Sequence, residues 1–464
     1  MSYQVVNREQ VEISPLNPPS DNLYSFRNGN PVVSFVIPNQ NKLLKASSIR
    51  LNGEIIVRNG AGAAVNNNNA KGGGGSQVTM NPRVSVHGAI QQITIMNQES
   101  NQTLETIRNY NRYLASVVPV TQSQNDFESH LSFGLQGSNH RVHGNFFNNP
   151  VGFCIPLLTG LLNSNTPIPL GNNGVRGLVI QLELTPDNML LHNFSRAANT
   201  DATANGGAFY QLRDLTLTYE LLNVDGSSQS QMGIPSSGAF SYNSVNNIYS
   251  VINASDHTQT YNLGTSNTLS IIHNFVPTTQ INNYLFDSLR TPALKNIVNN
   301  NYGEDIAVNE VIHARGGRNF PIDYEIDETV ANANSTPITN LDMNFVNAIK
   351  PIPKYNHSLK SLFTETNKGS RFNYQNLEGM PLSTESALFQ NDLSAAGAVV
   401  PNNKVYGIGV SFDNVSKVGV SFKDTPYSLR IKSALNGNSP NSIYTYTFNK
   451  NTLLYSPSGV MVQN

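Results

Sequence analysis

The same strand-rich pattern occurs twice in this chain, in two halves of similar length that a polar segment separates. The first half ends on two strand-like segments, 177–184 and 212–222. The second half ends on three more, 405–412, 427–431 and 443–448. Short runs rich in Val, Ile, Tyr, Phe and Thr are typical of β-strands. The sequence therefore predicts two tandem all-β domains.

The length of 464 residues suits two domains better than one, since a single hydrophobic core rarely grows beyond about 250–300 residues. The predicted linker is residues 223–237, because Asp225–Gln231 contains only small or polar side chains. The predicted parts, in chain order, are an N-terminal arm over 1–29, a first β domain over 30–222, the linker, and a second β domain over 238–464 with a long loop insertion around 327–400.

The charge pattern argues against a protein that binds nucleic acid directly. Charged residues make up only 13% of the chain, about half the usual share, and the net charge is −1. No two basic residues are adjacent, whereas phosphate binding needs clustered Lys and Arg. A nearly neutral chain also repels its own copies weakly, which favours self-association.

The single cysteine, Cys154, rules out a disulfide within the chain. Its apolar surroundings favour a small buried hydrophobe over a reactive thiol. Residues 1–8 lack the apolar core of a signal peptide, and no stretch of 18 apolar residues predicts a membrane-spanning helix. The glycosylation-like sequences at Asn193, Asn253 and Asn414 are expected as chance matches in an Asn-rich chain.

Several elements of the first half are predicted in more detail. Residues 32–37 and 89–96 are expected as strands, and 48–58 as strand segments around a turn at Asn52–Gly53. Leu104, Ile107 and Leu114 have helical spacing, so 102–115 is predicted as a short amphipathic helix packed against the end of a sandwich.

The second half is predicted to begin with strands at 250–252, 259–263 and 268–276. A short helix is expected at 281–289. A Gly316–Gly317 turn is expected to lead into a strand that extends to residue 326. Most of the insertion that follows has no periodicity that predicts a fold.

A search for catalytic, cofactor-binding or metal-binding residues assigns none. The Gly-rich segment 59–77 lacks the Gly-Lys-Ser/Thr order of a phosphate loop. His140 and His143 form a close pair but lack a third and fourth metal ligand, so hydrogen-bonded loop histidines are expected. Asp323, Glu325 and Asp327 share one face of a predicted strand, for which a solvated face is favoured over a calcium site.

Short strands and their spacing over most of the chain carry a resemblance to a known family. The similar segments are 88–95, 104–112, 156–160 and 180–184 in the first half, and 269–275, 406–413, 419–422 and 428–433 in the second. With these segments the chain resembles the double jelly-roll major capsid proteins of icosahedral DNA viruses, of the virophage, polinton-like virus and nucleocytoplasmic large DNA virus type.

The resemblance implies a fold and a function. The fold would be all-β, with two tandem eight-stranded antiparallel jelly rolls and a few short helices in loops. Three chains would form a homotrimeric capsomer with a pseudo-hexameric outline, and capsomers would tile the shell. Such a protein is not an enzyme and needs no cofactor. The loops 59–77 and 327–400 would form outer towers or locking contacts.

The partners that the resemblance implies are further copies of the chain, neighbouring capsomers, and penton and minor capsid proteins. The arm over residues 1–29 would lie beneath the shell, where an internal membrane is a further contact. No sequence-specific nucleic-acid binding is expected. The expected location is the virion, after synthesis in the cytoplasm or nucleus of the host without a secretory signal peptide.

Two other classes of function stay open at this point. A penton, minor capsid or receptor-binding virion protein shares the β-rich, Asn- and Gly-rich composition. An enzyme or a carbohydrate-binding protein can also be built on sandwiches, because a fold alone does not determine function. Two matched sandwiches favour the major capsid protein, and one sandwich with a protruding domain favours another virion protein. A pocket with a perturbed titratable group would favour the enzyme.

Overall fold

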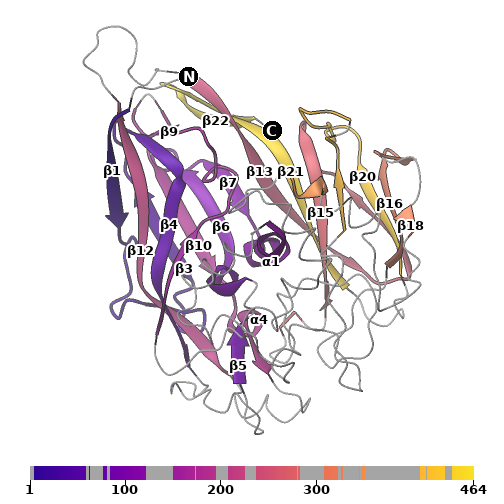
Figure 1. Ribbon diagram of the computed structural model, residues 1–464, viewed down its shortest axis with the longest axis horizontal. Coiled ribbons are helices and arrows are strands. Elements are labelled where there is room, and N and C mark those ends of the chain that lie inside the picture. The colour runs from indigo at the N-terminus through magenta and orange to yellow at the C-terminus, as the bar shows by residue number, and fades with distance from the viewer. Residues whose placement is uncertain are drawn as a thin grey trace, which may run out of the picture.

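The structure is a computed structural model in which two β-sandwiches stand side by side, with the helix α1 (Tyr110–Thr121) between them (Figure 1). The residues that it describes are 5–58, 62, 77–80, 84–121, 150–172, 174–194, 207–224, 237–278, 281–282, 308–321, 326–327, 344, 347–351, 408–413, 415–433 and 441–463.

The first sandwich consists of two antiparallel sheets. One sheet has the order β1 (Val5–Ile13), β12 (Phe209–Val224), β4 (Leu43–Arg58), β8 (Val151–Pro156), with β2 (Leu23–Tyr24) on β12 and β9 (Ile168–Pro169) on β4. The facing sheet has the order β3 (Val32–Ile37), β10 (Leu178–Leu184), β6 (Ile90–Asn97), β7 (Thr103–Ile107). The remaining elements of this half are β5 (Gln77–Met80), which pairs with β11 (Leu191–Phe194), and the short helices η1 (Ser85–Ala89) and α4 (Asp187–Leu190).

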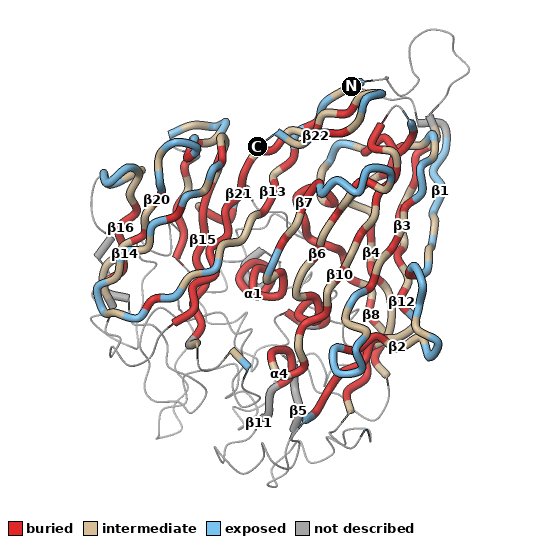
Figure 2. Tube along the Cα trace, turned by 180° about the vertical axis from the view of Figure 1, so that it is seen from behind, coloured by how far each residue is buried: buried red, intermediate tan, exposed pale blue. Residues whose placement is uncertain are grey.

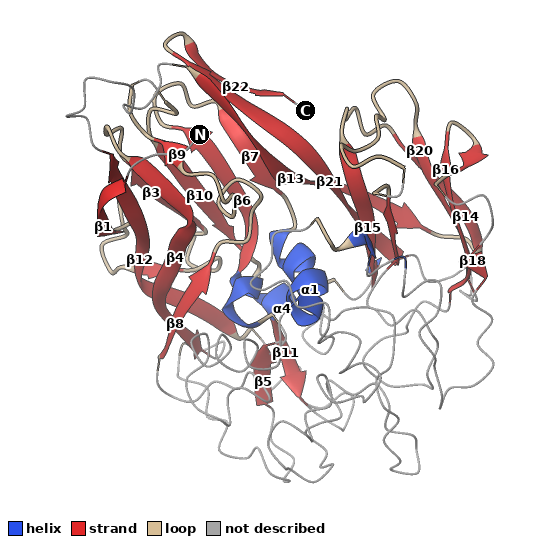
Figure 3. Ribbon diagram, turned by 45° about the horizontal axis from the view of Figure 1, so that its top comes forward, coloured by secondary structure: helices blue, strands red, loops and turns tan. Residues whose placement is uncertain are grey.

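The second sandwich repeats this arrangement. We call its first sheet the shared sheet; its order is β13 (Gly238–Ile252), β21 (Asn441–Ser456), β15 (Thr268–Pro277), β19 (Ile408–Ser411), with β22 (Gly459–Gln463) on β21. We call the facing sheet the outer sheet; its order is β14 (Asp256–Tyr261), β20 (Tyr427–Ser433), β16 (Val308–Arg315), β17 (Arg318–Asn319), with β18 (Ile326–Asp327) on β16. Figure 3 shows how strands make up both bodies, with helical segments near the junction.

The order of strands identifies the topology of each sandwich. Counted along the chain, the eight principal strands are β1, β3, β4, β6, β7, β8, β10 and β12 in the first half, and β13, β14, β15, β16, β17, β19, β20 and β21 in the second. In both halves one sheet contains strands 1-8-3-6 of this count, and the other contains 2-7-4-5. This is the double Greek key of an eight-stranded jelly roll. The predicted fold class, two tandem jelly rolls, is therefore confirmed.

Alternating burial explains why the predicted strands form. In β10 the side chains of Leu178, Ile180, Leu182 and Leu184 are buried, and those between them are half-buried. Because successive side chains of a strand point to opposite faces, this pattern places the four apolar side chains in one core. The neighbouring β3 was predicted at the bounds that the structure has, 32–37.

The predicted turn at Asn52–Gly53 is wrong, because both residues lie within the continuous 16-residue strand β4. Gly53 is required for close packing instead of for a turn. A Cβ atom at this position would lie 2.6 Å from Leu215 Cδ2 and 3.0 Å from the carbonyl oxygen of Arg213. Glycine within a strand often marks such a close approach of another chain segment.

The N-terminal segment also differs from the predicted arm over residues 1–29. Val5–Ile13 forms β1, which pairs antiparallel with β12 from Val5 opposite Val224 to Ile13 opposite Leu217. It is an edge strand, and residues 7–10 and 12 are exposed. An edge strand with one solvated face needs few apolar side chains, which explains why its sequence lacks a clear strand pattern.

The predicted helix over 102–115 is wrong in its first half. Residues 103–107 form β7, which pairs with β6 so that Ile107 lies opposite Ile93, and the helix starts only at Tyr110. Leu104 and Ile107 satisfy a helical spacing and are also both buried in the strand. Asn109, with a φ of 50°, makes the turn between the strand and the helix.

The second half contains one confirmed turn and several untested elements. Gly316 and Gly317, with φ of 58° and 80°, join β16 to β17 in a two-residue hairpin, as predicted. Residues 283–289 of the predicted helix lie outside the described residues, as do most of 59–77 and of 327–400. Within the latter, Ala348 and Ile349 are buried in the main core, so part of the predicted insertion packs inside the protein.

Replacing Gly53 with alanine should reduce the free energy of unfolding by about 1–3 kcal/mol, because the added methyl group overpacks the site beside Leu215. Urea unfolding followed by circular dichroism measures the change. The double variant with Leu215→Ala lacks the closest of these contacts, so the two single losses should sum to more than the loss of the double variant. Strict additivity would contradict the steric explanation.

Candidate functional site: the seam between the two sandwiches

The most distinctive region of the molecule is the surface where the shared sheet meets the first sandwich and α1; we call it the seam. The first nine residues of β21, 441–449, are all buried. Ile443 packs in the core of the second sandwich, whereas Tyr444, Tyr446 and Phe448 belong to the core that includes the first sandwich. Figure 2 shows this buried stretch beside α1. The shared sheet is therefore covered on both faces.

The helix α1 fills the seam. All residues from Tyr110 to Val117 are buried, so the prediction of an amphipathic helix at the end of one sandwich is wrong. The ring of Tyr113 lies 5.6 Å from that of Tyr446 and 6.1 Å from that of Phe448. A helix that is buried on all sides belongs in a protein interior, and here the second sandwich covers the side that solvent was expected to cover.

Polar contacts fix the position of α1 against the second sandwich. The Asn274 side chain of β15 donates from Nδ2 to Ser116 Oγ at 2.8 Å and to the carbonyl oxygen of Arg112 at 3.3 Å. The Tyr446 hydroxyl donates to the carbonyl oxygen of Asn109 at 2.8 Å. The buried Arg112 guanidinium lies over the ring of Tyr444, at 5.3 Å from its centroid. These directional contacts permit one orientation of the two sandwiches.

Glu105 joins three segments at the seam with one buried carboxyl group. Its Oε1 accepts hydrogen bonds from the backbone N–H of Gly160 at 3.1 Å and of Val245 at 3.3 Å. Its Oε2 accepts one from Leu161 at 2.8 Å. Val245 lies on β13, so this carboxyl group links β7 and a loop of the first sandwich to the edge of the shared sheet. At Gly160 a Cβ atom would overlap the backbone of Asn243 on β13.

Burial changes the ionisation of Glu105. Desolvation raises the pKa of its carboxyl from 4.5 to about 7, against the backbone N–H groups of Leu161, Val245 and Gly160, which lower it. The folded state therefore binds a proton at pH values where the unfolded chain has lost it. The contribution of this proton to the free energy of unfolding is fully present below about pH 4.5 and is lost as the pH rises through about 7.

Glu105→Gln should be less stable than the natural protein at pH 5, because its Nε2 cannot accept the backbone N–H that the replaced carboxyl oxygen accepts. Since glutamine does not titrate, the variant should not show the loss of stability, up to about 3 kcal/mol, that the natural protein shows between pH 5 and pH 8. Urea unfolding at both pH values measures this. The control Glu12→Gln, at an exposed position of β1, should show the pH dependence of the natural protein. A glutamine variant whose stability falls between pH 5 and pH 8 as much as that of the natural protein would contradict the assignment.

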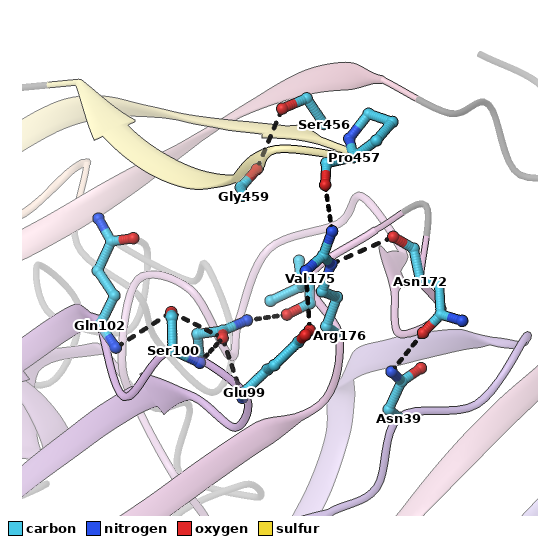
Figure 4. Close-up of polar contacts among 11 residues, drawn as sticks. Asn39, Glu99, Ser100, Gln102, Asn172, Val175, Arg176, Ser456, Pro457 and Gly459 are labelled. Carbon is cyan, nitrogen blue, oxygen red and sulfur yellow. Dashed lines mark hydrogen bonds and ion pairs between the residues drawn. The ribbon is translucent and has the colours of Figure 1, made fainter.

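A second link, which we call the latch, closes the far end of the seam (Figure 4). Arg176 Nη1 lies 2.9 Å from Glu99 Oε2 in the turn between β6 and β7. Its Nη2 donates to the carbonyl oxygen of Pro457, in the hairpin between β21 and β22. Its Nε donates to the carbonyl oxygen of Asn172 at 3.3 Å. One guanidinium thus connects two loops of the first sandwich with a hairpin of the second.

The backbone of Arg176 is strained, with a φ of 59°. For a residue with a side chain, this left-handed conformation costs about 1 kcal/mol, which glycine avoids. Arg176→Ala should therefore be less stable than Arg176→Gly by about 1 kcal/mol in thermal unfolding. Both variants lose the latch, so amide hydrogen exchange at 456–460 should rise in both. Unchanged exchange there would show that the guanidinium does not hold the hairpin.

Of the residues that the sequence analysis considered for chemistry, few lie in the described part of the chain. Cys154 lies half-buried in β8, and burial raises the pKa of its thiol, as expected for an unreactive cysteine. His140, His143, Asp323 and Glu325 lie outside the described residues, and Asp327 is in β18. Among the described residues, no group of three or more His, Cys, Asp or Glu side chains could hold a metal ion.

Among the described residues, the two carboxyl groups with raised pKa values both accept backbone hydrogen bonds. Besides Glu105, Asp187 has a pKa raised by burial to about 6, and its Oδ1 accepts the backbone N–H of Tyr210 at 3.1 Å. These carboxyl groups stabilise local structure, and their geometry provides no catalytic arrangement. Within the part of the chain that the structure describes, no helix is long and apolar enough to cross a membrane.

The residues of the seam were not found by sequence analysis. Glu105 and Arg112 were both counted within the predicted helix over 102–115, and Gly160 was noted only within a segment of the resemblance. A single glutamate in a short strand with two threonines gives no signal of burial, and no local pattern shows that a second domain covers it.

Comparison with known proteins gives a clear result only for structure. No family model matches the sequence, and the search of curated proteins finds no similar one. Among solved structures, the Faustovirus major capsid protein has a TM-score of 0.58 and 9% identity, over 98% of this chain and 92% of that one. PBCV-1 VP54, fitted into a cryo-EM reconstruction of the virophage Sputnik, has a TM-score of 0.55 and 11% identity, over 100% and 98%. A chain of the Sputnik virophage structure has a TM-score of 0.53 and 9% identity, over 100% of this chain and 89% of that one.

Proposed function

We propose that this chain, which has the double jelly-roll fold of viral major capsid proteins, is itself the major capsid protein of an icosahedral DNA virus. In this proposal it forms homotrimeric capsomers with a pseudo-hexameric outline, which tile the shell. The resemblance that the sequence carries agrees with the structural similarity over the whole chain. Identities of 9–11% show the fold, so the function is our inference from it.

The observation that carries the proposal is the equivalence of the two halves. Both are eight-stranded jelly rolls with the same strand order, and they stand side by side, with the shared sheet of the second packed against the first (Figure 1). Three such chains around a threefold axis present six similar bodies, and a closed ring leaves no interface unsatisfied. The seam supports this role because a tile needs a fixed angle between its two bodies.

The other classes of function have less support. A penton or a receptor-binding protein was expected to combine one sandwich with a different, protruding domain, whereas the described parts of both halves have the same topology. An enzyme would be supported by a perturbed titratable group in an open site. Glu105 is perturbed, but it is buried and its two oxygens accept three backbone hydrogen bonds.

We further propose the partners and the parts of the chain. The partners would be copies of this chain, neighbouring capsomers, and penton and minor capsid proteins, within the virion. The division of the chain at the linker 223–237 is kept as part of the proposal, with β12 ending at Val224 and β13 starting at Gly238. The first domain would then begin at β1, and the arm would be shorter than residues 1–29.

The purified chain should have the solution mass of three chains of 50.6 kDa by light scattering, and particles of the same peak should have a hexagonal outline in negative stain. Three pairs of equivalent bodies would produce this outline. A monomer or a five-membered ring would contradict the capsomer and would favour a penton, spike or binding protein.

A further inference from the structure

A chain of hydrogen bonds crosses the core of the second sandwich, between the shared sheet and the outer sheet. We call it the imidazole chain. On the shared sheet it contains His273 of β15 and Thr445 of β21, and on the outer sheet Tyr261, His313 and Tyr427. All five side chains are buried. The rings of His273, Tyr427 and His313 are stacked, with neighbouring centroids 5.9 and 6.2 Å apart.

Counting hydrogens determines which atom donates in each bond. Thr445 Oγ1 donates its single hydrogen to the Tyr261 hydroxyl at 3.0 Å, so it accepts from His273 Nδ1 at 2.9 Å. A neutral His273 then has a bare Nε2, which accepts the Tyr427 O–H at 2.9 Å. Tyr427 in turn accepts from His313 Nδ1 at 2.9 Å, which leaves His313 Nε2 without a hydrogen.

The imidazole chain is complete only while both histidines are neutral. His313 Nε2 is buried and has no hydrogen-bond partner among the described residues, so a proton there would be a buried charge without a partner. A proton on His273 Nε2 would leave the hydroxyl hydrogen of Tyr427 without an acceptor. Protonation of His273 therefore breaks its bond to Tyr427 between the two sheets, and the proton on His313 can be hydrated only if the sheets separate.

Among the described residues, the charged groups around the imidazole chain do not compensate such a proton. The carboxylates of the outer sheet, Asp256 and Glu310, lie on its outward face, where they pair with Arg430 at 2.7 Å and with Lys432 at 2.6 Å. The charged and titratable side chains on β14, β15, β16, β20 and β21 are, besides the two histidines, Tyr261 and Tyr427, the following: Asp256, His257, Glu310, Arg315, Arg430, Lys432, Tyr444, Tyr446, Lys450 and Tyr455. Arg315 follows on the same face of β16 as His313 and adds positive charge, which opposes protonation.

We propose that the imidazole chain makes the outer sheet an acid-sensitive element, which separates from the shared sheet below neutral pH while the seam stays intact. The bonds Thr445–Tyr261 and His273–Tyr427 both cross from the shared sheet to the outer sheet. Protonation of His273 removes the second of these bonds and so weakens the contact between the two sheets. The inference concerns the fold of the single chain and does not depend on its oligomeric state.

The direction of the pH dependence follows from the two histidines. Burial lowers the pKa of His313 from 6.5 to about 3, and burial together with His313 lowers the pKa of His273 well below 6.5. Because the unfolded chain binds protons below pH 6.5 and the folded chain does not, stability falls as the pH falls from about 6.5 towards 3. The ratio of folded to open protein should fall about tenfold per pH unit for each histidine. At the seam, protonation of Glu105 has the opposite effect and stabilises the fold.

Hydrogen exchange with mass spectrometry on the full-length natural protein tests the order of opening. Exchange is measured at pH 7.5 and pH 5, in the assembly state in which the protein purifies, with correction for the intrinsic rates. We expect β14, β16 and β20 to lose protection at pH 5, while β4, β12 and the buried part of β21 keep it. Equal loss in both sandwiches, or no loss in the outer sheet, would overturn the proposal. This arm of the experiment requires no variant.

A variant tests the chemistry. His313→Asn keeps a side-chain amide that can donate to Tyr427 and removes the titration. Lowering the pH from 7.5 to 5 should therefore reduce the protection of the outer sheet by a factor at least ten times smaller in this variant than in the natural protein. The control is Thr258→Asn, at an exposed position of β14 in the same sheet, which introduces the same amide without changing a histidine and should behave as the natural protein does. Loss of protection at the same pH in His313→Asn as in the natural protein would overturn the role of the imidazole chain.

Discussion

The shared sheet has no face left for solvent over the first nine residues of β21, and the rest of the molecule is arranged around this constraint. A strand buried on both faces is usually aliphatic. Here it alternates Ile443, Thr445 and Thr447 towards one core with Tyr444 and Tyr446 towards the other. Each hydroxyl in the interior needs a partner, because an unpaired buried polar group costs about 1–3 kcal/mol. The neighbouring layers supply these partners, so the layers can meet in only a few relative positions.

This requirement explains why the seam joins the sandwiches as one body. Apolar contact alone is not directional and would tolerate sliding between two flat layers. Glu105, in the middle of β7, and Arg176, in the loop before β10, each bind backbone groups from both sandwiches. Together with α1, they fix both the distance and the angle between the sandwiches. A shell built from such chains would inherit its geometry from these contacts.

The sequence predicted the strands that are buried on one face only. It failed for segments whose burial depends on a second layer of the structure. β3 and β10 alternate clearly, because solvent and core act on opposite faces. The segment 103–107 was assigned to a helix because the spacing of Leu104 and Ile107 fits one. The same two side chains are buried in the strand, where the neighbouring Glu105 is buried as well. In β4, Asn52–Gly53 has the composition of a turn, and only the approach of Leu215 explains the glycine. The seam and the imidazole chain depend on pairs such as His273 and Tyr427, which lie 154 positions apart, so no local pattern contains them.

The two sandwiches share a topology and differ in the chemistry of their cores. The core of the first is built mainly from Leu, Ile and Val, whose burial does not depend on pH. The second places His273, His313 and three hydroxyl-bearing side chains between its sheets, where they make hydrogen bonds that depend on the protonation state. Replacing such a network by apolar side chains of similar volume would often cost nothing in stability. The polar core therefore contributes something other than stability, namely a dependence on conditions that the first sandwich does not need. In the proposed opening at acidic pH, this asymmetry lets the first sandwich and the seam keep their structure while the outer sheet of the second sandwich separates.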